Sequence, residues 1–289
     1  MNDGMIIREL LTRDAGTEGS LLIQKKIYDT LISPPLRKRI GRNKAAFVLG
    51  PSSIPGSSVD VDLTTAQTMK VNKVSEGGAV PIKVVDHTSI NIRPHKYGCR
   101  PLVTKEMQED GKWDLILYNI GQAGLEMGYN EDKIIINDAL NSASSDNDIA
   151  TGGAMGYQDM GTAKKKLREN DFEPDTLFVG PKVLNDMENI DSYMEYNKIG
   201  GTDNMKNGLK GRLRGMDVHL FSPNVAPSST YTNIAYAIDS SNSFFLAEKR
   251  PLTIEKYDDV THDLSGVVVT QRFAASYLRP LAMSKITTT

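Results

Sequence analysis

Residues that could bind a metal ion or perform catalysis are few and scattered in this sequence. The four histidines form no HExxH pair, and Cys99 has no second cysteine with which to build a zinc site. His87 and His95 would share one face of a strand, but Pro94 argues against a continuous strand there. We interpret these histidines as a solvated strand face, and we predict no metal ion, no cofactor and no catalytic residue.

One loop has acidic residues at the spacing with which a calcium loop begins. Asp146 and Asp148 fit that opening, but the glycine and the closing glutamate required further along are missing, which favours an ordinary polar loop. The chain also lacks the GxGxxG, GxxxxGK[ST] and GxSxG motifs of dinucleotide, nucleotide triphosphate and hydrolase sites. These absences weaken an enzymatic interpretation, although a monomeric enzyme with an unrecognised site stays open as an alternative.

A basic run near the N-terminus is the first candidate contact site. It could bind the phosphates of a packaged genome, pair with acidic groups of a neighbouring subunit, or form a solvated arm. The net charge of -2 excludes a polycation that coats nucleic acid along its whole length, so any such contact must be local. The run consists of Arg37, Lys38, Arg39, Arg42 and Lys44.

The second candidate contact site lies on one long predicted helix, from Thr104 to Asn141. Its apolar residues recur at spacings of three, four and seven. Thr104 and Asp114 are both candidate N-caps, and Gly111 is expected to break a short leading turn from the main run. Gly121, Gly124 and Gly128 fall on one stripe of this helix, and each costs about 1 kcal/mol relative to alanine. Either another element or subunit approaches this stripe closely, or packing elsewhere tolerates a weak helix.

The segments before this helix do not resemble a compact domain. Residues 1–58 predict an extended arm with one short helix at Ser20 to Ile32, followed by prolines and a turn-rich stretch. Apolar and polar residues alternate from Ile82 to Arg93. Together with Met69 to Val74 and a turn at Glu76 to Gly78, they predict a long two-stranded hairpin within residues 59–102. A hairpin of this kind is only marginally stable alone, so we expect it to lie on another surface.

The segments after the helix predict a discontinuous domain with a second domain inserted into it. Residues 153–243 carry short helices and strands of a mixed α and β domain, and residues 244–289 return to strands. Between Gly266 and Leu278, alternate apolar residues form a face against which the long helix could pack. The expected elements are helices at 162–170 and 181–187 and strands at 177–179, 217–221, 234–238, 244–248, 252–257 and 266–278.

Length and composition are compatible with a large folded protein that does not enter a membrane. The 289 residues suffice for two domains or for one domain with long excursions. No apolar run approaches the roughly 18 residues of a membrane span, and the first residues lack the features of a signal peptide. A single cysteine is consistent with a reducing compartment.

The order of arm, hairpin, long helix, inserted domain and returning strands resembles the major capsid proteins of tailed double-stranded DNA viruses, with the Hong Kong 97-type phage capsid fold. Three stretches carry the resemblance: RPLVTKEMQEDGKWDLILYNIGQAGLEMGYNEDKIIINDAL, FEPDTLFVGPKVLNDM, and FFLAEKRPLTIEKYDD followed by GVVVTQRFAASYLRPLAM. It covers most of the chain from about Val59 onward.

The resemblance implies an α+β subunit with an N-terminal arm (1–58), an E-loop hairpin (59–102), a peripheral domain with the spine helix (103–152 and 244–289) and an axial domain (153–243). It implies self-assembly as hexamers and pentamers into an icosahedral virion capsid around DNA, in the host cytoplasm. Portal, scaffolding and cement proteins would be further partners. An encapsulin-type shell around cargo enzymes is the alternative. Lysines are present in the hairpin region, but no motif predicts crosslinking.

Overall fold

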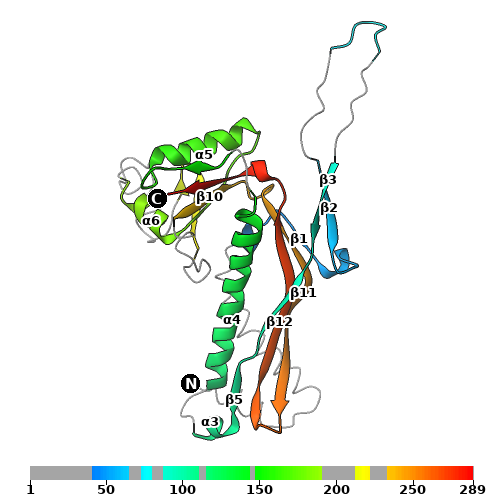
Figure 1. Cartoon of the computed structure of the whole chain (residues 1–289), viewed down its shortest axis with the longest axis vertical. Coiled ribbons are helices and arrows are strands. Elements are labelled where there is room, and N and C mark those ends of the chain that lie inside the picture. The colour runs from blue at the N-terminus through cyan, green and yellow to red at the C-terminus, as the bar shows by residue number, and fades with distance from the viewer. Residues whose placement is uncertain are drawn as a thin grey trace.

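The computed structural model describes an elongated subunit of mixed α and β structure. A long helix runs beside a long pair of strands (Figure 1). A second sheet, built of shorter strands and covered by its own helices, lies at one end, and a two-stranded hairpin projects away from the body (Figure 1). The described residues are 41–64, 73–79, 87–110, 115–143, 147–190, 212–221 and 233–288. The predicted helix at Ser20 to Ile32 lies outside them.

The body is built on a five-stranded sheet whose centre is an antiparallel pair of long strands, β11 and β12. β4 and β5 both pair with β12 on its other side, and the short β1 runs parallel to β11. The strands are β1 (Val48–Leu49), β4 (His95–Cys99), β5 (Leu102–Thr104), β11 (Phe244–Asp259) and β12 (Leu264–Tyr277).

β11 is one strand where the sequence predicted two, at 244–248 and 252–257. Its register against β12 shifts between Glu248 and Arg250 and again between Arg250 and Thr253. Such irregularities let a strand accommodate a residue that cannot donate to the ladder, here Pro251, without ending the pairing. The prediction of a break was therefore wrong, and the strand continues through the proline.

The predicted long helix is present and begins as expected. The Thr104 hydroxyl accepts a hydrogen bond from the Met107 backbone amide at 3.2 Å, which caps the short helix α3 (Lys105–Asp110). The main helix α4 (Leu115–Ile134) then runs along the five-stranded sheet. The expected break at Gly111 lies outside the described residues.

The packing of this helix against the returning strands is confirmed. Ile120, Ala123 and Met127 of α4 form one buried cluster with Val267 and Val269 of β12. These two valines are two residues apart and therefore project from the same face of the strand. The five-stranded sheet thus turns this face toward the helix.

Near the C-terminal end of the predicted helix, six residues form a π-helix, η3 (Ile135–Leu140), instead of an α-helix. The backbone amide of Asn141 accordingly donates to the carbonyl of Ile136, five residues back, at 2.8 Å. Ile134, Ile135 and Ile136 are all buried. Three successive residues cover more than half of the helix circumference, so this end must be enclosed from several sides.

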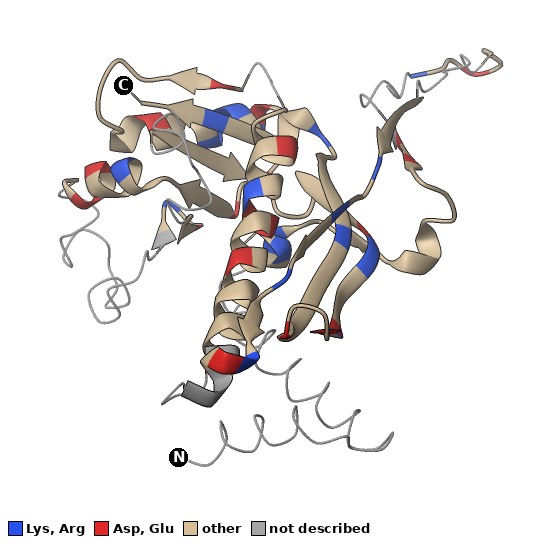
Figure 2. Ribbon diagram, turned by 60° about the horizontal axis from the view of Figure 1, so that its bottom comes forward, with Lys and Arg blue, Asp and Glu red and all other residues tan. Residues whose placement is uncertain are grey.

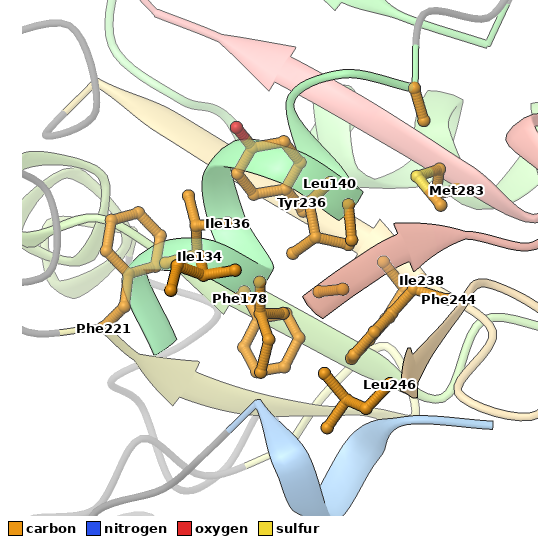
Figure 3. Packing of buried hydrophobic residues seen from close by; sticks show 14 of the residues in the cluster. Ile134, Ile136, Leu140, Phe178, Phe221, Tyr236, Ile238, Phe244, Leu246 and Met283 are labelled. Carbon is orange, nitrogen blue, oxygen red and sulfur yellow. The ribbon is translucent and has the colours of Figure 1, made fainter. Parts of the chain in front are cut away.

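The enclosure comes from a second, six-stranded sheet that meets the helix end. Phe178, Tyr236 and Ile238 of this sheet pack against η3 together with Phe244 and Leu246 of β11 (Figure 3). The strands, in spatial order, are β6 (Ile149–Ala150), β13 (Met283–Thr287), β10 (Ile234–Ile238), β7 (Thr176–Val179), β9 (Met216–Leu220) and β8 (Arg212–Leu213).

Two helices cover the other face of the six-stranded sheet. They are α5 (Tyr157–Glu169) and α6 (Pro181–Glu188), and both contribute to a second buried cluster with this face. α5 begins five residues earlier than predicted. The Asp159 carboxylate accepts a hydrogen bond from the Gly156 amide at 2.8 Å, a capping contact that the sequence analysis overlooked.

The six-stranded sheet does not consist of residues 153–243 alone. Its strands β6 and β13 come from the segments that we assigned to the peripheral domain, and β13 pairs with β10 over five residues. The C-terminal strand therefore ties the two units together. The strand had not been predicted, although its residues at 283–287 bury three of five side chains.

The hairpin is formed by β2 (Val59–Thr64) and β3 (His87–Ile92), which pair only with each other among the described residues. The predicted turn is present, with Gly77 at a φ of 77° that favours glycine. Met69 to Val74 was predicted as the second strand, but residues 69–72 lie outside the described ranges. The partner found for β3 is β2 instead, whose Val59, Val61 and Leu63 alternate with polar residues.

Candidate functional site

Arg42, one member of the basic run, is partly buried and joins three separate elements. Its guanidinium contacts Glu248 of β11, with Nη2 at 2.5 Å from Oε2, and Glu131 of α4, with Nη1 at 3.4 Å from Oε1. The Glu131 side chain is fully buried, and that of Arg42 is 23% exposed. Because Arg42 itself belongs to the short helix η1 (Arg42–Lys44), the ion pairs attach the start of the described chain to the spine helix and to the long strands.

Neighbouring hydrogen bonds extend this group into a buried polar cluster. The amide of Gln271 on β12 donates to Glu248 at 3.0 Å and to Glu131 at 3.2 Å. The backbone amide of Gly41 donates to Asp132 at 3.0 Å. We call Arg42, Glu131, Asp132, Glu248 and Gln271 the arm latch, because together they tie the first described residues of the arm to the body.

The charges of the arm latch stabilise one another. Burial alone would lower the pKa of the Arg42 guanidinium, but its hydrogen bonds and its attraction to Glu248 and Glu131 outweigh burial and hold the pKa above its ordinary value. Arg42 therefore keeps its proton under all practical conditions. Charge-assisted contacts of this kind fix geometry as well as contribute energy.

The acidic half of the arm latch was not predicted, although a signal was present in the sequence. Glu131 stands four residues after Met127 and four before Ile135, so it falls on the apolar stripe of the helix. A carboxylate on a buried stripe requires a cation or several donors. Gln271 carried the same kind of signal, because it lies between Val269 and Phe273 on the strand face that the sequence predicts to pack against the helix.

Lys44, the other member of the basic run among the described residues, is also paired within the subunit. Lys44 lies 3.7 Å from Asp217 of β9, an ion pair with the neighbouring sheet of the same subunit. Arg37, Lys38 and Arg39 lie outside the described residues. Arg42 and Lys44 are thus engaged by carboxylates of their own chain, a pairing that we had not considered, and their contact with a genome or a neighbouring subunit remains a prediction.

The glycine stripe is partly enclosed within the subunit. Gly124 and Gly128 are buried, whereas Gly121 is half-buried and a side-chain carbon added there would meet no atom within 4 Å. The described part of the same subunit therefore leaves room for a side chain at Gly121 and does not require a glycine there. A close approach by another subunit at this position remains a prediction.

The described residues offer no constellation for metal or nucleophilic chemistry. They contain no group of three or more His, Cys, Asp and Glu side chains that could hold a metal ion. β3 ends at Ile92 and β4 begins at His95, so the two histidines lie on different strands, as Pro94 indicated. Burial, followed by the nearby charge of Glu126, raises the pKa of the Cys99 thiol, which disfavours a reactive thiolate. Among the described helices, none has the length and apolar character of a membrane span.

Solved structures with the same fold are capsids and capsid-like particles. A chain from the mature capsid of bacteriophage PhiM1 superposes with a TM-score of 0.65 at 11% identity, covering 86% of this chain and 87% of that one. The capsid of a native GTA particle gives 0.63 at 13% identity, covering 87% and 90%. A virus-like particle from Pyrococcus furiosus gives 0.59 at 15% identity, covering 91% and 98%. These likenesses confirm the Hong Kong 97-type fold.

Sequence comparison gives the family itself. No curated protein matches the chain. The family model described as phage capsid protein matches residues 88–286, well over half of the chain, from β3 through the spine helix and both sheets into the last strand. Taken with the spine helix, the projecting hairpin and the two sheets, this match shows that the chain belongs to the family of phage capsid proteins.

Proposed function

We propose that this chain is the major capsid protein of a tailed double-stranded DNA virus. Copies of it assemble as hexamers and pentamers into an icosahedral shell that encloses the viral DNA. The role is structural, and the chain works by burying its own surface against identical neighbours. Many weak repeated contacts then sum to a stable shell.

The projecting hairpin is the observation that carries this proposal. β2 and β3 form a two-stranded sheet, and a sheet of this size is marginally stable in water unless it packs on something else. Among the described residues, its own subunit covers the base of the hairpin, where Ile92 packs with Ile54, Phe245 and Ala274. The far ends of β2 and β3 extend beyond the body (Figure 1), as expected of a hairpin that lies on a neighbouring subunit.

Portal, scaffolding and cement proteins are further partners of the proposed shell, and packaged DNA is a non-specific one. Assembly takes place in the host cytoplasm under this proposal. The DNA contact is weak because the net charge of the chain is -2, which supplies no general attraction to phosphate.

Sedimentation velocity of the purified chain tests the proposal. Under assembly conditions, such as raised protein concentration or added polyethylene glycol, we expect a fast-sedimenting species of narrow distribution. A chain that stays monomeric under all such conditions, with a compact scattering profile, would instead support the alternative of a monomeric enzyme.

An encapsulin-type shell is the second candidate, and the likeness to the Pyrococcus furiosus virus-like particle favours keeping it. That match covers 98% of the particle chain. The content of native particles separates the two functions, because a DNA-filled virion absorbs strongly at 260 nm, whereas a protein cargo appears as a second band on a gel. Neighbouring terminase and portal genes would likewise favour the virus.

A further inference from the structure

Three basic side chains stand in one row across the five-stranded sheet. Arg272 on β12 is the direct partner of Lys96 on β4 and of Arg250 on β11. Directly opposite residues project from the same face of a sheet, with their Cβ atoms about 5 Å apart. Figure 2 shows basic positions side by side on neighbouring strands of this sheet.

This arrangement is unfavourable in the isolated subunit. Like charges directly opposite one another destabilise a sheet. Within the described part of the chain, no carboxylate lies within ion-pair distance of Lys96, Arg250 or Arg272. The neighbouring Lys249 is also held by neutral groups, since its ammonium donates to the backbone carbonyls of Ile54 and Gly56. The row therefore lacks an internal anion.

The row lines a hollow on the surface with a volume of about 510 Å³, to which Arg93 and His95 also contribute. The Nε of Arg272 donates to the Pro94 carbonyl at 3.0 Å, which fixes the plane of its guanidinium and leaves its two terminal nitrogens for a ligand. Lys96 and Arg250 are exposed. We call Arg93, Lys96, Arg250 and Arg272 the basic pocket.

The shape of the basic pocket favours carboxylate side chains over the phosphates of a DNA duplex. A duplex is bound by basic residues that follow its backbone over many phosphates. Here the positive charge does not extend along β12, because Thr270 and Ala274, the neighbours of Arg272 on the same face of that strand, are uncharged. A hollow of about 510 Å³ also admits a projecting side chain more readily than a DNA duplex. The arginines of the pocket can pair with a carboxylate in a bidentate geometry.

We propose that the basic pocket receives carboxylate side chains from a second copy of this chain at a subunit contact. This inference rests on the proposed function, because it requires neighbouring subunits. The sheet face that holds the pocket also carries the base of the hairpin. Exposed carboxylates on projecting elements of the described chain can supply the partner groups: Asp60 and Asp62 of β2 and Asp258 of β11.

Neutralising the pocket tests whether it acts between subunits. The full chain with Lys96→Gln and Arg250→Gln should keep its melting temperature or gain slightly, because repulsion within the row falls. Its yield of assembled particles should drop at least about tenfold. The matched control is Lys165→Gln, a 75% exposed lysine on α5 that pairs with Glu169 within its own helix, and it should assemble as the unaltered chain does.

Zero-length crosslinking identifies the partner groups. A carbodiimide couples a lysine amine to a carboxylate in contact with it, and particles assembled from mixed 15N-labelled and unlabelled chains reveal links between copies. We expect Lys96 to link to an Asp or Glu of another copy, and Lys96→Arg, which keeps the charge, to assemble without that link.

Two results would overturn the inference, and a third would contradict the proposed function on which it rests. Normal particle yield of the double variant, together with no inter-copy link from Lys96 in particles of the unaltered chain, shows that the pocket is no subunit contact. Normal yield with loss of packaged DNA shows that the pocket binds phosphate instead. Failure of the unaltered chain to form particles contradicts the proposed function itself.

Discussion

Replacing Arg42 by methionine should destabilise the subunit substantially. The substitution keeps much of the side-chain volume but removes the cation that contacts Glu131 and Glu248. Removing one partner of a buried ion pair costs about 3–5 kcal/mol, because a charge stays buried without compensation. Arg42 is 23% exposed, so water can partly replace it, and we expect the lower end, about 3 kcal/mol.

Thermal unfolding of the unassembled chain measures this cost. A loss of about 3 kcal/mol corresponds to a melting temperature lower by roughly 5–10 °C for a chain of this size. Lys44→Met is the matched control two residues away. Its partner Asp217 lies 3.7 Å from the ammonium and is 40% exposed, so this pair should contribute at most about 1 kcal/mol.

A second substitution shows whether Arg42→Met destabilises the subunit through lost packing or through a carboxylate left buried without its cation. Adding Glu248→Gln to Arg42→Met removes one of the uncompensated carboxylates and should restore part of the melting temperature. Limited proteolysis should also cut near residue 41 faster in Arg42→Met, because the arm latch holds that segment to the body. A change below about 1 kcal/mol for Arg42→Met, or further destabilisation by Glu248→Gln, would refute the assigned role of the latch.

Further substitutions test the helix, the sheet and one surface pair. Gly121→Ala should raise the stability of the subunit by about 1 kcal/mol, since the added carbon meets no atom within 4 Å. If another subunit approaches Gly121 closely, the yield of particles should fall in the same variant. An unchanged particle yield would contradict the predicted contact. Gly266→Ala should lower the free energy of unfolding by at least about 1–3 kcal/mol, because the added carbon would lie 2.2 Å from the Pro101 carbonyl oxygen. Chemical denaturation measures this loss, and an unchanged denaturation midpoint would refute the described pairing of β5 with β12. The pKa of Glu173 is lowered from 4.5 to about 2, most strongly by the hydrogen bond from Arg168 and further by Lys164. Because the pKa of Glu173 is lower in the folded chain, the ionised carboxylate stabilises the fold fully above pH 4.5, and this stabilisation is lost as the pH falls towards 2. The melting temperature of Glu173→Gln should therefore lie slightly below that of the unaltered chain at pH 6 and equal it near pH 2. A difference that stays constant with pH would show that the ionisation of Glu173 does not contribute to stability.

The elements with a strong local pattern were predictable from the sequence. The spine helix follows from its apolar stripe, and β7, β10 and α6 follow from short apolar runs with turn residues around them. The π-helical end was not predictable, because it arises where two sheets enclose Ile134 to Ile136 from several sides. The joining of β13 to the six-stranded sheet likewise depends on pairing between residues about 50 positions apart in the chain.

The contact residues were predictable only in part, because sequence gives charge without giving partners. The basic run was found as a cluster in the chain, yet Arg42 faces carboxylates of its own subunit. The basic pocket was overlooked, because Lys96, Arg250 and Arg272 come from distant segments and only the register of three strands aligns them. Clustering of basic residues in the sequence therefore did not indicate which of them lack an ion pair with a carboxylate in the described part of the same subunit.

Electron cryo-microscopy of the assembled chain tests the central claim most directly. We predict closed icosahedral shells in which the hairpin of each subunit, including the turn at residues 73–79, lies on the body of an adjacent subunit. Shells would then owe their stability to interlocking neighbours. Particles in which the hairpin folds back on its own subunit, or a preparation that contains only monomers, would contradict the account.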